Sequence, residues 1–132
     1  GLTLKGPKRI YVGYYSSVGM LFAQKHGFFR TYHELVFEMF WSHHLDVDEL
    51  SEMRAVIERL GGSADEYEAY AHGAGKEEHD RIIQEAEAMG VFGVPFMIFE
   101  GEKFFGGDRI DLLKEYLEAA STVISNSVQE VA

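Results

Sequence analysis

An aspartate and an arginine, Asp108 and Arg109, follow Gly106 and Gly107 at the start of a segment whose apolar residues recur at helical spacing. Those apolar residues are Ile110, Leu113, Leu117, Ala120 and Ile124. The first N–H groups of a helix lack partners within it, and the helix dipole is positive there, so a helix start favours an anion. The pattern therefore favours an anion near this helix start. In the simpler interpretation, Asp108 is only a helix cap and Arg109 a solvated neighbour.

A proline, Pro95, stands where the glycine-punctuated loop GVFGV meets the apolar run Phe96–Phe99. The run has no polar alternation, which predicts a strand buried on both faces. Because proline has no N–H to donate to a sheet, the bond between Val94 and Pro95 is a candidate cis peptide. A turn at Glu100–Gly101 then leads into a second short strand, Lys103–Phe105.

Two adjacent serines, Ser16 and Ser17, lie between a β-branched and aromatic stretch, Arg9–Tyr15, and a helical pattern that runs from Val18 to about His26. We expect the first stretch to form a strand and the second to form a helix. Serine at such a junction accepts a hydrogen bond from the helix start. Capping is therefore the role that the residues themselves indicate for this pair.

His43 and His44, with Asp46 and Asp48 close by, have the residue types of a metal site. Adjacent histidines usually point apart, however, and the helical i, i+4 spacing of two ligands is absent. We therefore expect a solvated loop here and predict no metal site. The neighbouring aromatic cluster of Phe37, Phe40 and Trp41 is predicted to be part of the core.

The chain of 132 residues contains no cysteine. Thiol–disulfide exchange needs a protein thiolate, so the chain is not itself a disulfide oxidase or isomerase. Its formal net charge of −10 argues against nucleic acid as a partner, because phosphate binding needs clustered Lys and Arg. No apolar run approaches the roughly 20 residues that span a bilayer, so we expect no membrane partner and a cytoplasmic location.

Helical patterns dominate the region between the first stretch and Pro95. The clearest is Thr31–Trp41, where Tyr32, Leu35, Val36, Met39 and Phe40 form one apolar stripe. Asp46 or Asp48 is predicted to cap a second helix, in which Leu50, Met53, Ile57 and Leu60 face inward. Ser63 and Glu66 form a capping box, and a helix over about Lys76–Met89 is expected to bury Ile82, Ile83, Ala86 and Met89.

The segment GVFGVPFMIFEGEKFFGGDRIDLL resembles the C-terminal half of thioredoxin-like proteins of the DsbA group, and most of all their glutathione-using branch. That branch contains the kappa-class glutathione transferases and the 2-hydroxychromene-2-carboxylate isomerases. The G-V-x-G-V/T-P loop is typical of the group, and the G-x-D-R helix start is more specific to the branch. More loosely, AQKHGFFRTYHELVFEMFW is similar to the inserted helical domain of the same proteins.

The resemblance implies an α-rich α/β protein with a thioredoxin-like fold. We expect one domain over residues 1–132, with a helical insertion at about 18–90 and a C-terminal ββα unit at about 94–125. Family members carry a strand, an active-site helix and another strand before the insertion, whereas this sequence offers one candidate strand and one short helix. The expected sheet is therefore reduced to two or three strands, in either a fragment or a compacted version of the family.

Glutathione is the cofactor that the resemblance implies, and it assigns roles to five residues. The Val94 backbone, beside Pro95, would pair with the cysteinyl part of glutathione. Asp108, with Arg109 next to it, would receive the γ-glutamyl ammonium, and Gly107 would supply a backbone contact. Relatives often carry a polar side chain at the position of Gly107, so one hydrogen bond is expected to be missing.

The resemblance also gives Ser16 and Ser17 a catalytic role, as hydroxyls that favour the glutathione thiolate. The family pattern at that position is S-P, whereas this chain has S-S-V. The implied activity is that of a glutathione-dependent isomerase or transferase acting on a small molecule. The alternative is a non-catalytic fragment or binding module. Relatives are commonly dimers, and a short sheet leaves an open edge, so we expect a homodimer.

Overall fold

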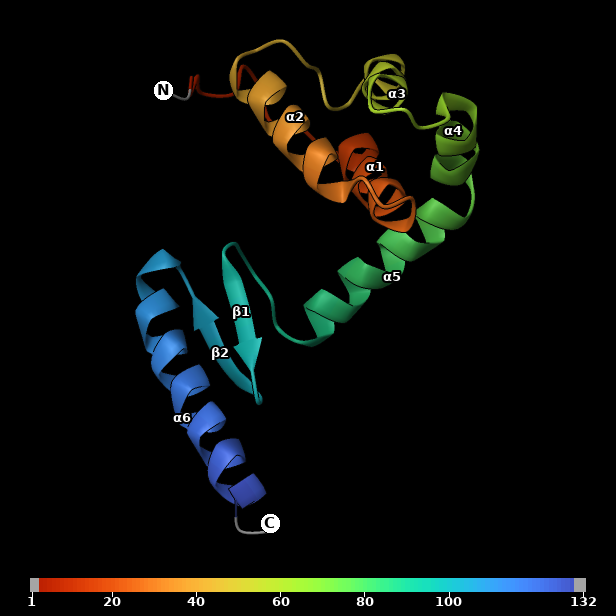
Figure 1. Cartoon of the computed structure of the whole chain (residues 1–132). Helices are drawn as coiled ribbons and strands as arrows, with labels where there is room; N and C mark the ends of the chain where they lie inside the picture. Colours follow the sequence, from red (N-terminus) through yellow and green to blue (C-terminus); the bar gives the residue numbers. More distant parts are fainter. Residues whose placement is uncertain (1–2, 130–132) are drawn as a thin grey trace. The chain divides into compact units, whose positions relative to one another are not determined.

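The computed structural model describes the backbone of residues 3–129 and the side chains of residues 3–121. It divides into two compact units, Gly1–Glu85 and Ala86–Ala132. The first unit holds α1 (Tyr14–Lys25), α2 (Phe29–Trp41), α3 (Leu50–Arg59), α4 (Ala64–His72) and most of α5 (Ala74–Ala88) (Figure 1). The second unit holds β1 (Phe96–Phe99), β2 (Glu102–Phe105), the 3-10 turn η1 (Gly107–Arg109) and α6 (Ile110–Gln129). The chain is thus mostly helical with a two-stranded sheet, as the sequence predicts.

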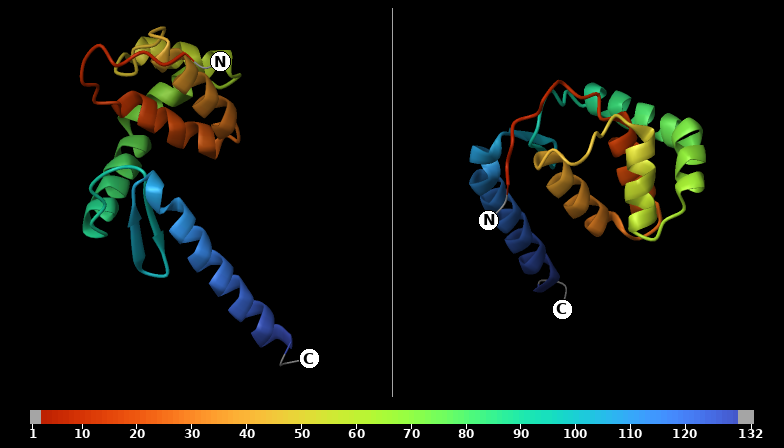
Figure 2. Two further views of the ribbon diagram at one scale, coloured as in Figure 1. Left: turned by 90° about the vertical axis from the view of Figure 1, so that its left-hand side faces the viewer. Right: turned by 90° about the horizontal axis from the view of Figure 1, so that it is seen from above.

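The core of the first unit lies between α1, α2, α3 and α4, which Figure 2 shows from two further directions. Its buried side chains include Val18, Phe22, Tyr32, Val36, Met53, Ile57 and Tyr67. The stripe predicted on α2 faces this core, because Tyr32 and Val36 are buried and Leu35, Met39 and Phe40 pack against it. A Cβ on Gly19 of α1 would overlap the Tyr32 hydroxyl, so glycine is what lets the two helices approach.

Three tyrosines anchor α1 to its neighbours through their hydroxyl groups. Tyr32 donates to the Ser16 carbonyl oxygen at 2.7 Å, and Tyr67 donates to the Tyr15 carbonyl oxygen at 2.8 Å. Tyr14 donates to the carbonyl oxygen of Ala71 at 2.6 Å. Burial raises the pKa of both Tyr32 and Tyr67, so these hydroxyls stay protonated and keep donating.

Residues Arg9–Tyr15 do not form the predicted strand. Residues 9–13 form an irregular segment and α1 already begins at Tyr14. Two causes are visible: Gly13 adopts the left-handed conformation, with φ of +71°, and the N–H groups of Val12 and Gly13 donate to the carboxylate of Asp48 rather than to a strand. A side-chain acceptor distant in sequence has replaced the sheet partner that the local pattern requires.

The predicted burial of apolar side chains on α5 and on β1 is also wrong. Ile82 and Ile83 of α5 are 40% and 43% exposed, and Met89, just past its end, is 49% exposed. Ile98 of β1 is 41% exposed, so the strand is not buried on both faces. Apolar periodicity identifies these elements correctly, but it does not say whether the described chain covers the apolar face.

The second unit is an antiparallel β-hairpin followed by α6 (Figure 1). The register pairs Phe96 with Phe105 and Phe99 with Glu102, and the turn at Glu100–Gly101 connects the strands. Phe104 is buried and its ring meets Tyr116 of α6 edge-on at 5.4 Å between centroids. The helix predicted at residues 110–124 is confirmed, and the side chain of Ile124 lies outside the described residues.

Within residues 3–129, no helix is both long and apolar enough to cross a lipid bilayer.

Candidate functional site

The hairpin brings the Pro95 loop beside the start of the last helix. Since Phe96 pairs with Phe105, the residues just before β1 lie next to those just after β2. The Gly106 N–H donates to the carbonyl oxygen of Pro95 at 3.0 Å, and the Arg109 N–H donates to the Gly106 carbonyl oxygen at 3.2 Å. Five residues with predicted roles therefore gather at one end of the hairpin: Val94, Pro95, Gly107, Asp108 and Arg109.

The Val94–Pro95 peptide bond is cis, which confirms the expectation from the sequence. Val94 is 87% exposed, and its backbone N–H and C=O have no hydrogen-bond partner in the described part of the chain. These two groups are free to pair with an extended ligand as a strand edge would. A Cβ on the preceding Gly93 would lie 2.9 Å from the Phe105 ring, so the loop can lie flat against that ring only with glycine there.

Asp108 and Arg109 lie in η1, one turn before α6 begins at Ile110. Their charged groups are 3.7 Å apart, with side chains 79% and 57% exposed. Gly106 precedes the turn with φ of +98°, and a Cβ there would lie 2.5 Å from Asp108 Oδ1, so the carboxylate folds back over this glycine. A Cβ on Gly107 would meet nothing within 4 Å, which leaves open space beside the carboxylate.

Ser16 and Ser17 lie in the first turn of α1, so the prediction that they cap this helix is wrong. Gly13 takes the capping position, because its left-handed backbone starts the helix before the serines. Ser16 donates its hydroxyl to the Gly13 carbonyl oxygen at 3.0 Å, whereas Ser17 Oγ has no hydrogen-bond partner among residues 3–121. The serines belong to the first unit and the hairpin residues to the second.

Both serines border hollows on the surface of the first unit. One hollow of about 260 Å³ is lined mostly by apolar side chains: Tyr11, Gly13, Ser16, Val36, Phe37, Phe40, Trp41 and Val47. A second, of about 150 Å³, is lined by Ser16, Ser17, Met20, Tyr32, His33, Val36 and Phe37. Phe37 is 52% exposed, so its predicted place in the core is wrong. Phe40 does pack against the core, and it lines the first hollow together with Phe37 and Trp41. Periodicity could not show this, because Phe37 sits at the margin of the stripe on α2.

Asp48 positions the start of α1, a role that the sequence did not reveal. Its Oδ1 accepts from Gly13 N at 2.6 Å, and its Oδ2 accepts from Val12 N at 3.1 Å and from Arg9 Nη1 at 2.7 Å. Burial alone would raise the pKa of Asp48, but the hydrogen bonds from Gly13, Val12 and Arg9 outweigh it and lower that pKa. The predicted cap of α3 by Asp46 or Asp48 is wrong, since Glu49 precedes α3 and makes no side-chain cap.

His43 and His44 do not form a metal centre with the nearby aspartates. His43 Nε2 lies 2.8 Å from the Gly6 carbonyl oxygen and His44 Nδ1 lies 2.9 Å from Ser42 Oγ. Asp46 pairs with Arg9 at 3.0 Å. Across the described residues, no three His, Cys, Asp or Glu side chains are grouped as a metal ion requires.

Over most of its length the chain is similar to known proteins in sequence and in structure. The family model for the DSBA-like thioredoxin domain matches residues 14–118. A 2-hydroxychromene-2-carboxylate isomerase from Sphingobium xenophagum is 33% identical over 78 residues, which cover 58% of this chain and 40% of that protein. The solved structure of a selenomethionine 2-hydroxychromene-2-carboxylate isomerase matches with a TM-score of 0.72 and 25% identity, covering 100% of this chain and 63% of that one.

The chain thus spans less than two thirds of the length of either relative. The match of the family model includes the helices of the first unit as well as the hairpin and the first part of α6. The loop and helix start that carry the sequence resemblance also lie within it. The chain therefore belongs to the family of DSBA-like thioredoxin domains.

Proposed function

We propose that the end of the hairpin binds reduced glutathione and that the chain serves a glutathione-dependent isomerase or transferase whose substrate is a small molecule. One observation carries the proposal. The β1–β2 register places the unpaired backbone groups of Val94 beside Asp108 and Arg109, with open space at Gly107. A peptide-like ligand with an ammonium group needs this combination of an open backbone edge and a carboxylate.

Each residue at the hairpin end suits one part of glutathione. The Val94 N–H and C=O would pair with the cysteinyl backbone, and the Asp108 carboxylate would receive the γ-glutamyl ammonium. The Asp108 carboxylate is 79% exposed and its ion pair with Arg109 is long, so it can turn toward a ligand at little cost. When bound, glutathione supplies the thiol that this cysteine-free chain lacks.

Ser17 is the better candidate of the two serines for steadying a ligand thiolate. Its hydroxyl proton is unused within the described chain, whereas the Ser16 hydroxyl already donates to Gly13. A hydroxyl that donates to a sulfur anion lowers the pKa of the thiol and favours the thiolate at neutral pH. We therefore propose that Ser17→Ala reduces turnover more than glutathione affinity, and that Ser16→Ala has the smaller effect.

Two relatives carry the name 2-hydroxychromene-2-carboxylate isomerase, and this similarity supports the class of reaction. A planar aromatic substrate of that kind would find suitable walls in the hollow lined by Phe37, Phe40 and Trp41. The absence of cysteine from the whole sequence is consistent with a thiol that arrives on a ligand.

Calorimetric titration of the protein with reduced glutathione tests the proposal. We expect binding, and we expect Asp108→Ala to weaken it by about 1–3 kcal/mol, because a charge-assisted contact is lost. Asp111→Ala is the matched control, since Asp111 is a similarly exposed carboxylate one residue past Ile110 and pairs with Lys114. If millimolar glutathione gives no heat and no shift in melting temperature, the proposal is wrong.

The alternative function is a binding module without catalytic activity. The hydrogen bond between Ser16 and Gly13 favours it, because that hydroxyl is committed to the helix start. The two functions differ in one assay: an enzyme isomerises 2-hydroxychromene-2-carboxylate in a glutathione-dependent way, whereas a binding module takes up glutathione without turnover.

We further propose that the chain forms a homodimer. The sheet has two strands, both with an outer edge that no described strand covers, and Phe105 and Ile98 on it are exposed. Unpaired strand edges next to apolar side chains are templates for pairing with another chain. Sedimentation velocity at micromolar concentration should show a dimer, and a monomer at all concentrations tested would contradict this.

A further inference from the structure

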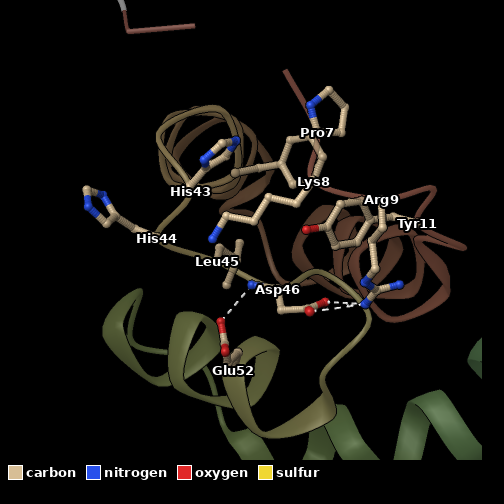
Figure 3. A pocket seen from close by; sticks show the side chains of 10 residues that line it. Pro7, Lys8, Arg9, Tyr11, His43, His44, Leu45, Asp46 and Glu52 are labelled. Atoms are coloured by element: carbon tan, nitrogen blue, oxygen red, sulfur yellow. Dashed lines mark hydrogen bonds and ion pairs between the residues drawn. The ribbon is translucent and has the colours of Figure 1, made fainter. Parts of the chain in front are cut away.

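A third hollow of the first unit, of about 410 Å³, lies where the N-terminal segment crosses the connection between α2 and α3 (Figure 3). The segment is held in place at several points. Lys5 N donates to the Trp41 carbonyl oxygen at 2.9 Å, His43 Nε2 meets the Gly6 carbonyl oxygen, and Arg9 pairs with Asp46 and Asp48. The walls of the hollow are therefore fixed before any ligand arrives.

Two opposite charges line this hollow without an ionic partner in the described chain. Lys8 Nζ makes no hydrogen bond or ion pair there, and Figure 3 shows its side chain extending into the hollow. Glu52 uses only Oε2, which accepts from Asp46 N at 2.7 Å, and it pairs with no cation. Lys8 and Glu52 also do not pair with each other. The charges of Arg9 and Asp46, by contrast, neutralise one another.

The remaining walls offer an apolar and aromatic surface. The rings of Tyr11 and Phe40 meet edge-on at 5.1 Å between centroids, and Leu45 is buried beneath them. The Arg9 guanidinium lies 4.2 Å from the centre of the Tyr11 ring, which fixes the orientation of that ring. An aromatic side chain of a small ligand can pack against such walls.

We propose that this hollow binds a small zwitterion of the α-amino acid class that carries an aromatic side chain. Lys8 receives the carboxylate, Glu52 receives the ammonium, and the ring packs against Tyr11 and Phe40. Both side chains are exposed, and a ligand with both charges can form a charge-assisted hydrogen bond with each of them. A simple anion would pair with Lys8 but would leave Glu52 without a partner. A simple cation would pair with Glu52 but would leave Lys8 without a partner. The hollow shares Tyr11 and Phe40 with the hollow proposed for the substrate, but it contains none of the hairpin-end residues that are proposed to bind glutathione.

The test is a titration of the ¹⁵N-labelled protein, followed by amide chemical shifts, with three ligands of similar shape. L-phenylalanine carries both charges, 3-phenylpropanoate lacks the ammonium, and 2-phenylethylamine lacks the carboxylate. We expect phenylalanine to bind at least about fivefold more tightly than either of the others, because each loses one charge-assisted contact in an exposed setting. The shifted amides should be those of residues 8–11, 43–46 and 52.

Variants then assign each charge to its partner. Lys8→Ala should weaken phenylalanine and 3-phenylpropanoate but leave 2-phenylethylamine unchanged, while Glu52→Gln should weaken phenylalanine and 2-phenylethylamine only. Glutamine keeps an oxygen that can accept from Asp46 N, so the loop should remain intact. Matched controls are Lys103→Ala and Glu49→Gln, whose side chains line none of the hollows described above.

Three results would overturn the proposal. One is equal affinity for phenylalanine and 3-phenylpropanoate. Another is equal sensitivity of all three ligands to Lys8→Ala. The last is a set of shifted amides confined to the hairpin end, which would place the ligand at the proposed glutathione site instead.

Discussion

Replacing Asp48 by alanine should destabilise the first unit by about 2 kcal/mol. The side chain is only 17% exposed and accepts hydrogen bonds from the backbone of Val12 and Gly13 just before α1. Loss of a capping side chain costs about 0.5–2 kcal/mol, and hydrogen bonds to a charged group contribute about 1.5–3 kcal/mol. The partner Arg9 is half exposed, so its ion pair adds little to this figure.

Urea unfolding followed by the fluorescence of Trp41 reports this change, since Trp41 is the only tryptophan and lies on α2 of the first unit. Asp111→Ala in the second unit is the control and should leave the transition unchanged. The effect of Asp48→Ala must also depend on pH. Because the folded pKa of Asp48 is lowered, its contribution is fully present above the ordinary value of about 4 and is lost as the pH falls through the folded pKa.

Asp48 does not stabilise the first unit in this way if the variant unfolds at the same urea concentration as the control. The same holds if the difference from the wild-type protein is as large at pH 2 as at pH 7. Either result would mean that the carboxylate does not hold the start of α1.

Three other substitutions probe the packing around α1 and α4. Tyr67→Phe removes the buried hydrogen bond to the Tyr15 carbonyl oxygen and should cost about 0.5–1.5 kcal/mol in urea unfolding, which is the net contribution of one such bond. Ser63→Ala removes the side chain that caps α4 and should lower stability by about 1 kcal/mol, whereas Ser51→Ala on exposed α3 surface should not. Gly19→Ala should cost about 1–3 kcal/mol by pushing against the Tyr32 hydroxyl, measured as a lower melting temperature.

The regular helices and the hairpin were predictable because their signals are local. The stripe on α2, the cap of α4 by the Ser63 side chain and the glycine turn at Gly101 each lie within a few residues, and each forms as predicted. The cis bond before Pro95 was also predictable, since a proline that opens a strand has few alternatives.

The start of α1 was not predictable from local pattern. The aromatic stretch before Ser16 has strand propensity, but Asp48, distant in sequence, takes its N–H groups and Gly13 turns the chain. The predictions of burial were wrong for a related reason. Ile82 and Ile98 have apolar neighbours at the expected spacing, but whether that apolar face is buried depends on which other segments pack against it. Sequence periodicity carries no information on that packing.

Part of the candidate site followed from the sequence and part did not. The residues Val94, Asp108 and Arg109 were predicted from their motif, and the β1–β2 register explains why the two segments lie at the same end of the hairpin, while their role in binding stays a prediction. The hollows beside Ser16 were missed, because Phe37 reads as part of an apolar helix face whether or not a neighbour covers it.

We propose that the end of the hairpin recognises reduced glutathione. The most direct test is a titration of the ¹⁵N-labelled protein with reduced glutathione, followed by amide chemical shifts. We predict saturable shifts at Val94, Gly107 and Asp108 that weaken in Asp108→Ala and persist in Asp111→Ala. An absence of shifts at these amides in millimolar glutathione, or shifts that Asp108→Ala leaves unchanged, would contradict the account.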